Sequence, residues 1–206
     1  MAELMALGFR SVPVTVIGGQ AIRGFKPNLV SRALGLGLGV SALGLDETIP
    51  LLGRTLEAVE RAARQIPDDK LNWTAPGRDR PMSEFVYHIF AEAESRSAVL
   101  ETGEYSHEGH EKGRFYESFQ GIADYGAGVV ERYRAWASRQ DVEALCLTPA
   151  GGPDNRSPGE RLDVLTGHTI QHLRQIYWVL EHFDITPEGR IQDSEFPPEF
   201  VLTKLW

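Results

Sequence analysis

The sequence is poor in cysteine and has no long apolar run. Cys146 is the one cysteine among 206 residues, so an internal disulfide framework is excluded and a reducing compartment is favoured. The longest apolar stretch, residues 33–45, contains four glycines and is too short to cross a bilayer. No basic segment followed by an apolar one marks a signal peptide. We therefore expect a cytoplasmic protein that does not enter a membrane.

The sequence also lacks an excess of positive charge. Asp and Glu number 29 against 21 Lys and Arg, which gives a formal net charge of −8. A nucleic-acid-binding protein normally shows a basic excess or a basic stripe, and neither is present. An acidic surface also disfavours anionic lipid. The composition thus excludes nucleic acid and membrane as expected partners, while 42% hydrophobic residues predict a folded core.

The chain divides into four unlike parts. Residues 1–35 are typical of a small mixed α/β segment, and residues 36–45 form a linker rich in Gly and Leu. In residues 46–184, apolar side chains recur with the 3.6-residue period of amphipathic helices. Residues 185–206 contain three prolines and predict a non-helical tail. We expect one helical domain with a small N-terminal appendage.

Four helices are predicted within the helical part. The first ends before Pro67, the second opens at Ser83, the third begins near Phe115, and the fourth has Pro158 at its first position. Four helices of this length indicate a four-helix bundle. The predicted fold class is therefore mainly α, with the bundle preceded by a short ββα fragment.

The fourth predicted helix carries two histidines, His168 and His172, at the spacing i, i+4. This spacing puts both imidazoles on one face, one turn apart, and the face is otherwise apolar. His88 lies on the apolar face of the second helix. Three neutral imidazoles suit Zn, Ni, Fe or similar ions, and three protein ligands leave a position open for chemistry. The alternative is that the histidines are hydrogen-bonded core residues without a metal.

Three motifs resemble the DinB/YfiT superfamily of helical-bundle metalloproteins. They are LNWTAP at 71–76, MSEFVYHI at 82–89 and LTGHTIQHLRQI at 165–176. That family places one metal-binding histidine on its second helix and an HxxxH pair on its fourth. The resemblance covers about residues 46–184 and implies a metal site formed by His88, His168 and His172.

Known activities in this family imply a function. Some members use bacillithiol or mycothiol as a thiol donor in S-transfer or in isomerisation. We therefore expect a divalent-metal-dependent enzyme of the thiol S-transferase type, with a small-molecule thiol and an electrophile as partners and a homodimer as a possible assembly. Zn or Ni is the first expectation for the ion, and Fe or Mn the second. The alternatives are a non-catalytic, stress-related metal-binding bundle and a purely structural bundle.

Two polar residues are candidates to orient a ligand or a substrate. Glu92 lies one turn beyond His88, and Gln175 lies three residues beyond His172. Ordinary polar residues on a helix surface explain both equally well. Arg78 and Arg80, which precede the second helix, could meet an anionic substrate. We expect Cys146 to be a packing residue, because no second cysteine is present to pair with it.

The N-terminal segment resembles the C-terminal half of a glutaredoxin. The residues that carry the resemblance are GFRSVPVTVIG at 8–18 and GFKP at 24–27. Pro13 matches the cis-proline of that family, and the backbone of Val12 matches the position that holds a thiol substrate. The CxxC motif is absent, so thiol–disulfide exchange is excluded for this fragment. One explanation is that it is a degenerate remnant. The other, which we expect, is that the reading frame begins upstream and that Met1 is an internal start codon.

Overall fold

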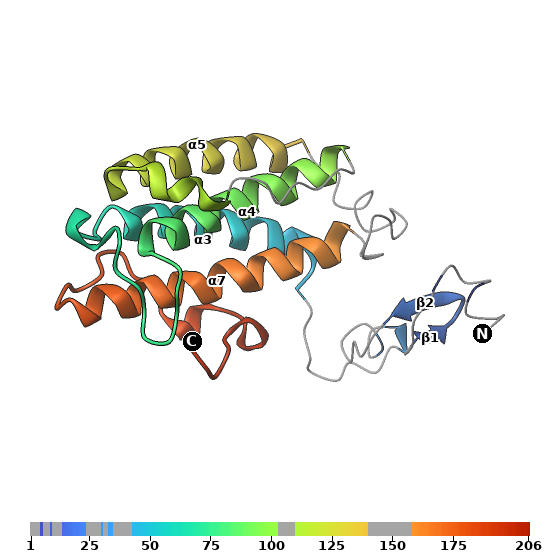
Figure 1. Cartoon of the computed structure of the whole chain (residues 1–206). Coiled ribbons are helices and arrows are strands. Elements are labelled where there is room, and N and C mark those ends of the chain that lie inside the picture. Colours follow the sequence, from blue (N-terminus) through green and yellow to red (C-terminus); the bar gives the residue numbers. More distant parts are fainter. Residues whose placement is uncertain are drawn as a thin grey trace. The chain divides into compact units, whose positions relative to one another are not determined.

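The computed structural model describes residues 14–23, 43–102, 110–139 and 158–206, together with residues 5, 9, 30, 33 and 34. The chain separates into two compact units, Met1–Gly44 and Leu45–Trp206. The second unit contains the long helices (Figure 1). All three histidines of interest belong to it.

The first unit contains an antiparallel hairpin of β1 (Val14–Ile17) and β2 (Gln20–Arg23). The turn between the strands consists of Gly18 and Gly19, whose φ angles are 56° and 85°. Two successive positive φ angles are typical of the tight turns that match strand twist, and glycine adopts them without strain. The predicted hairpin is therefore present. Its origin in a glutaredoxin is not confirmed, and Val12 and Pro13 lie outside the described residues.

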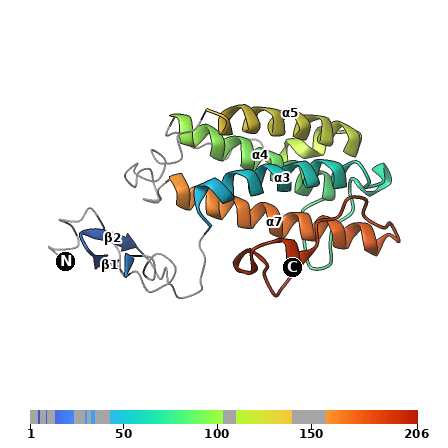
Figure 2. The same ribbon diagram turned by 180° about the vertical axis from the view of Figure 1, so that it is seen from behind.

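The second unit is a four-helix bundle. Its helices are α3 (Leu45–Ala63), α4 (Met82–Thr102), α5 (Phe119–Ala137) and α7 (Pro158–His182). Helix α3 packs against α5 and α7, and α4 packs against the same two helices (Figures 1 and 2). The helices thus form a closed ring in the order α3, α5, α4, α7. The predicted mainly α four-helix bundle is confirmed, and the two strands of the ββα fragment predicted to precede it in the sequence are present.

The core of the bundle follows the predicted apolar stripes. Leu52, Leu56 and Val59 of α3 are fully buried, as are Ile170 and Ile176 of α7. Each stripe repeats every three or four residues, so one face of each helix meets its neighbours. Burial of these side chains removes apolar surface from water and stabilises the ring of helices. Among the described residues, no helix combines the length and hydropathy needed to span a bilayer.

The third predicted helix begins later than the sequence pattern indicates. Residues His110–Phe115 form a separate 3₁₀ segment, and Phe115 is 74% exposed instead of joining the apolar face. Ser118 is the residue just before α5. Its side-chain oxygen accepts a hydrogen bond from the amide of Gly121 at 3.1 Å and so caps the helix. A capped start at Phe119 is more stable than an uncapped start near Phe115.

The residues after α7 return along the bundle. They contain two 3₁₀ turns, Asp193–Glu195 and Pro198–Phe200, in an otherwise irregular path. Phe196 is buried, and the ring of Phe200 lies next to Gly167, where an added Cβ would be 3.1 Å from it. The tail is therefore packed against α7 as part of the second unit.

Candidate metal centre

Three histidines meet between α4 and α7. Nε2 of His168 lies 3.2 Å from Nε2 of His88 and 3.0 Å from Nε2 of His172. One nitrogen from each ring lies within 4.8 Å of the other two. The structure thus brings together, from positions 80 residues apart, the three side chains that the sequence motifs singled out.

Helix geometry and packing explain this meeting. His168 and His172 lie one turn apart on α7, so their rings lie on one side of it with centroids 4.2 Å apart. His88 comes from α4, which packs against α7. Phe85, almost one turn before His88, places its ring nearly perpendicular to that of His172, at a centroid distance of 4.9 Å. The histidines are therefore held by the packing of two helices.

Burial keeps the two α7 imidazoles neutral. Burial, together with the nearby rings of His172 and His88, lowers the pKa of His168 to about 3. Burial also lowers the pKa of His172 from its ordinary value. Neutral imidazole, with a free lone pair, is the form of histidine that binds metals. The two rings are therefore ready to act as ligands at neutral pH.

Hydrogen bonds among the rings cannot satisfy this cluster. A neutral imidazole nitrogen either donates one proton or accepts through one lone pair. Nε2 of His168 faces two other Nε2 atoms. It can form a well-aligned hydrogen bond with only one of them, and its contact with the other is then unfavourable. Its Nδ1 is buried and has no partner among the described residues, so it can carry the proton while Nε2 faces inward. A divalent ion between the Nε2 atoms would remove the opposition, and the donor set fits a borderline transition metal.

The two polar candidates lie close to the histidines. Oε1 of Gln175 is 2.5 Å from Nδ1 of His172. Glu92 is 3% exposed and accepts a hydrogen bond from Nε of Arg96 at 2.6 Å. Burial lowers the pKa of His168, and the negative charge of Glu92 partly counteracts this shift. A buried amide and a buried carboxylate thus accompany the imidazoles.

Residues 51–176 match the model of the DinB superfamily. The chain belongs to the DinB superfamily. No curated protein and no solved structure matches it. The matched range covers more than half of the chain and includes all three histidines, so the metal-type cluster belongs to the DinB part of the chain, and the hairpin lies outside it.

Two exposed arginines of this DinB protein act electrostatically on His172. Arg78 and Arg80 are exposed residues of the loop before α4. Burial is the main cause that lowers the pKa of His172, and the positive charges of Arg80 and Arg78 add to the effect. Their positive charges therefore act on His172 in the same direction as burial. Cys146, the predicted packing residue, lies outside the described residues.

Sequence reasoning missed the contribution of the tail to the DinB site. The ring of Trp206 lies 5.9 Å from that of Phe85, which in turn contacts His172. The carbonyl of Leu205 accepts a hydrogen bond from Nε2 of Gln175 at 2.6 Å. The tail has no helical period from which its packing could be read.

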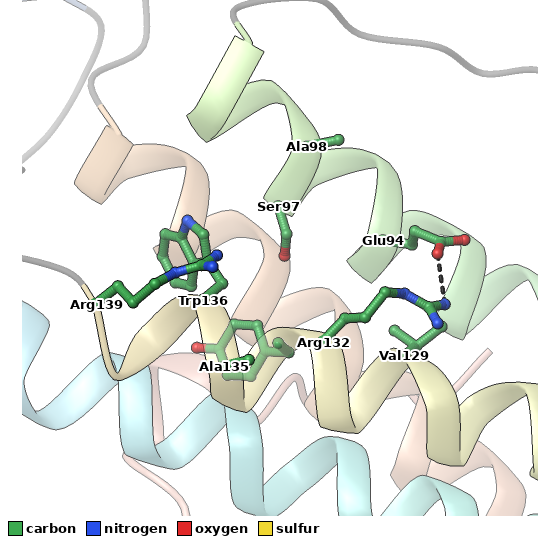
Figure 3. A pocket seen from close by; sticks show the side chains of 9 residues that line it. Glu94, Ser97, Ala98, Val129, Arg132, Ala135, Trp136 and Arg139 are labelled. Carbon is green, nitrogen blue, oxygen red and sulfur yellow. Dashed lines mark hydrogen bonds and ion pairs between the residues drawn. The ribbon is translucent and has the colours of Figure 1, made fainter.

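A separate cavity lies between α4 and α5 (Figure 3). Its volume is about 360 Å³, and its lining includes Ser97, Val129 and Trp136. Arg132 also lines it and forms an ion pair with Glu94 at 2.5 Å. None of the three histidines is among the lining residues. This cavity is therefore separate from the three-histidine cluster.

Proposed function

We propose that this DinB protein is a divalent-metal-dependent enzyme that joins a low-molecular-weight thiol, of the bacillithiol or mycothiol kind, to an electrophile. The observation that carries the proposal is the convergence of three histidines, one ring nitrogen from each lying within 4.8 Å of the other two. A set of three protein ligands is typical of catalytic rather than structural sites. The thiol is proposed from the resemblance to DinB enzymes that use such thiols.

The residues of this chain have distinct proposed tasks. His88, His168 and His172 hold the ion, and burial keeps the α7 pair in the neutral form that binds it. When an ion is bound, its Lewis acidity would lower the pKa of a thiol so that the thiolate is available at neutral pH. Exposed Arg78 and Arg80 attract an anionic substrate.

The overall reaction forms one bond and releases one proton. The thiol sulfur bonds to an electrophilic carbon, and the S–H bond and the bond between that carbon and its leaving group break. The leaving group departs with its electron pair, and the thiol proton passes to solvent or to the leaving group. The buried carboxylate of Glu92, although paired with Arg96, is the acidic group of α4 placed to accept or orient a proton near the histidines. Zn or Ni is the first ion to test, followed by Fe and Mn.

A thiol-consumption assay with reactive electrophiles tests this function. Metal-loaded protein should consume thiol faster than the uncatalysed reaction, and the His168→Ala/His172→Ala double variant should not. Stable metal binding by the wild-type protein without any thiol consumption would instead make it a non-catalytic metal-binding bundle and would overturn the enzymatic proposal.

A further inference from the structure

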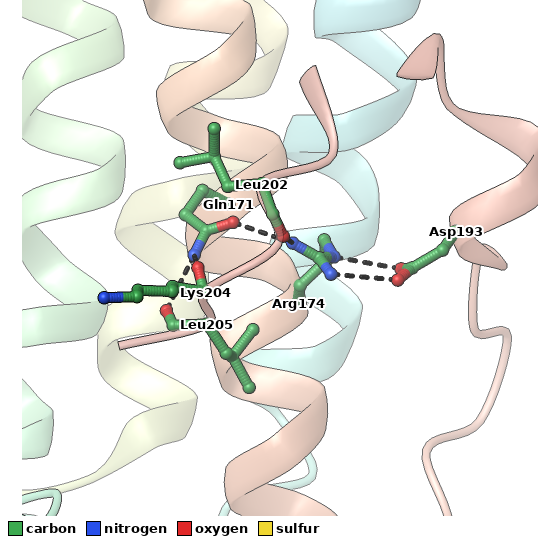
Figure 4. A network of polar contacts seen from close by, with 6 residues as sticks. All are labelled: Gln171, Arg174, Asp193, Leu202, Lys204 and Leu205. Carbon is green, nitrogen blue, oxygen red and sulfur yellow. Dashed lines mark hydrogen bonds and ion pairs between the residues drawn. The ribbon is translucent and has the colours of Figure 1, made fainter. Parts of the chain in front are cut away.

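Residues 202–206 are attached to α7 by the side chains of Gln171 and Arg174 (Figure 4) and by that of Gln175. Nε2 of Gln171 lies 3.0 Å from the carbonyl oxygen of Lys204 and 2.6 Å from that of Leu205. Nη1 of Arg174 donates to the carbonyl of Leu202 at 2.9 Å, and its guanidinium pairs with both carboxylate oxygens of Asp193 at 3.0 Å. The segment is thus held by hydrogen bonds to its backbone.

The third attachment leads directly to the metal centre. A carbonyl oxygen can only accept, so the 2.6 Å contact requires the amide nitrogen of Gln175 to face Leu205. The amide oxygen is then the atom that faces His172, at 2.5 Å from Nδ1. Because this oxygen can only accept, Nδ1 of His172 must carry the proton, and Nε2 must present its lone pair to the cluster.

A second contact joins the same segment to the same histidine. Trp206 packs between the ring of Phe85, at 5.9 Å, and the ring of Trp178, at 5.6 Å. Phe85 lies edge-on against His172 at 4.9 Å. The segment therefore acts on both the protonation of His172 and the packing that holds its ring.

We infer that residues 202–206 are a working part of the metal centre. The carbonyl of Leu205, through Gln175 as a positioning residue, sets the tautomer in which His172 binds metal. This inference rests on the proposed metal site and adds a coupling to it. Docking of the segment and binding of the ion must strengthen each other by the same factor, because coupling between two binding equilibria is reciprocal.

The inference distinguishes His172 from His168. Nδ1 of His168 has no partner among the described residues, and the lone pair on Nε2 of His172, 3.0 Å from Nε2 of His168, favours the proton of His168 on the nitrogen that faces the cluster. His172 is prepared for metal before the ion arrives, and His168 is not. Partners that orient metal-binding histidines typically change metal affinity about 10–100-fold when they are removed.

Spectroscopy of the metal-free protein tests the tautomer directly. A long-range proton–nitrogen correlation spectrum should show His172 protonated at Nδ1 in the wild-type protein. Gln175→Ala should lose this signal. Gln171→Ala is the matched control. Gln171 lies on the same helix, and its side-chain amide also binds Leu205 but binds no histidine. This variant should therefore keep the signal.

Metal titration tests the coupling. With Zn²⁺ or Ni²⁺ as the probe, Gln175→Ala should weaken binding about 10–100-fold, and Gln171→Ala should weaken it much less. Gln175→Glu keeps an acceptor for Nδ1 but places a carboxylate against the carbonyl of Leu205. The metal affinity of Gln175→Glu should be closer to that of the wild-type protein than the metal affinity of Gln175→Ala is. A merely structural role for Gln175 does not explain such a difference between the two variants.

Proteolysis measures the reciprocal effect on the tail. Lys204 is exposed, and trypsin cuts after lysine, which would separate Leu205 and Trp206 from the bundle. Saturation with Zn²⁺ or Ni²⁺ should slow this cut in the wild-type protein. Gln175→Glu should lose that protection, because its side chain no longer connects the tail to His172.

Each result decides one part of the inference. Equal metal affinity of the wild-type protein and Gln175→Ala, or a His172 protonated at Nε2 in the metal-free protein, would overturn it while the proposed function stands. Failure of the wild-type protein to bind metal would overturn the proposed function and, with it, the coupling. The tautomer spectrum still separates the two failures, because it requires no metal.

Discussion

A histidine buried beside two others is harder to protonate than a histidine in water. Burial and the neighbouring imidazoles lower the pKa of His168 to about 3, since a charged ring would lose hydration and meet like charge. The same lone pair that resists a proton is available to a metal ion. At the scale of the residue, a proton and a metal ion therefore compete for the same lone pair of His168.

The metal-free protein should lose stability as the pH falls below about 6.5. Between the ordinary pKa of 6.5 and the lowered value of about 3, the unfolded chain binds a proton at His168 that the folded chain does not. The free energy of unfolding should therefore decrease with falling pH, by at most about 1.4 kcal/mol per unit for this group. Urea unfolding across this range measures it.

The His168→Ala variant is the control for this pH dependence. It retains the carboxylates, whose titration also affects stability in acid. The difference between the wild-type and variant slopes therefore reports His168. Identical slopes in the two proteins would show that His168 does not resist protonation in the folded state.

The residues of the site differ in how far sequence could predict them. The pairing of His168 with His172 follows from helix geometry alone. His88 required a family resemblance, because spacing within one helix says nothing about which helices meet. Leu205 acts through a backbone carbonyl, which any residue type provides, so its role carries no sequence signal.

At the scale of the element, the contact between α4 and α5 depends on a glycine. Gly126 of α5 faces Phe90 of α4, which is fully buried. A Cβ atom at Gly126 would lie 2.4–2.6 Å from atoms of the Phe90 ring. The close approach of the two helices therefore requires the absence of a side chain at this position.

Replacing Gly126 should reveal this constraint. Gly126→Ala should lower the free energy of unfolding by about 1–3 kcal/mol, because the buried ring must shift. Gly128→Ala, in the same helix, meets only the end of the Arg132 side chain at 3.2 Å and should raise it by up to about 1 kcal/mol through helix propensity. Chemical denaturation measures both variants, and equal effects would contradict the packing described.

The elements themselves were largely predictable. Apolar residues at helical spacing predicted all four helices, because one face of each must be buried. The predicted start of the third helix was wrong. Capping by Ser118 starts α5 after this residue and outweighs the apolar character of Phe115. The path of the tail was not predictable, because it depends on side chains of α7 such as Gln171 and Arg174 and not on a period of its own.

At the scale of the whole molecule, the chain consists of two compact units. The donor atoms of His88, His168 and His172 all come from the second unit, as do Gln175 and the tail. The resemblance of the first unit to a redoxin remains a prediction, because the described hairpin is too small an element to identify a fold. The proposed metal centre therefore consists of residues of the second unit.

Metal analysis of the full chain tests the central claim most directly. The protein and its His168→Ala/His172→Ala variant are each loaded with Zn²⁺ or Ni²⁺, dialysed against metal-free buffer and measured by elemental analysis. The convergence of the three histidines predicts that the wild-type chain retains a single ion, and that the variant, with the same fold by circular dichroism, retains none. Equal metal content in the two proteins would contradict the account.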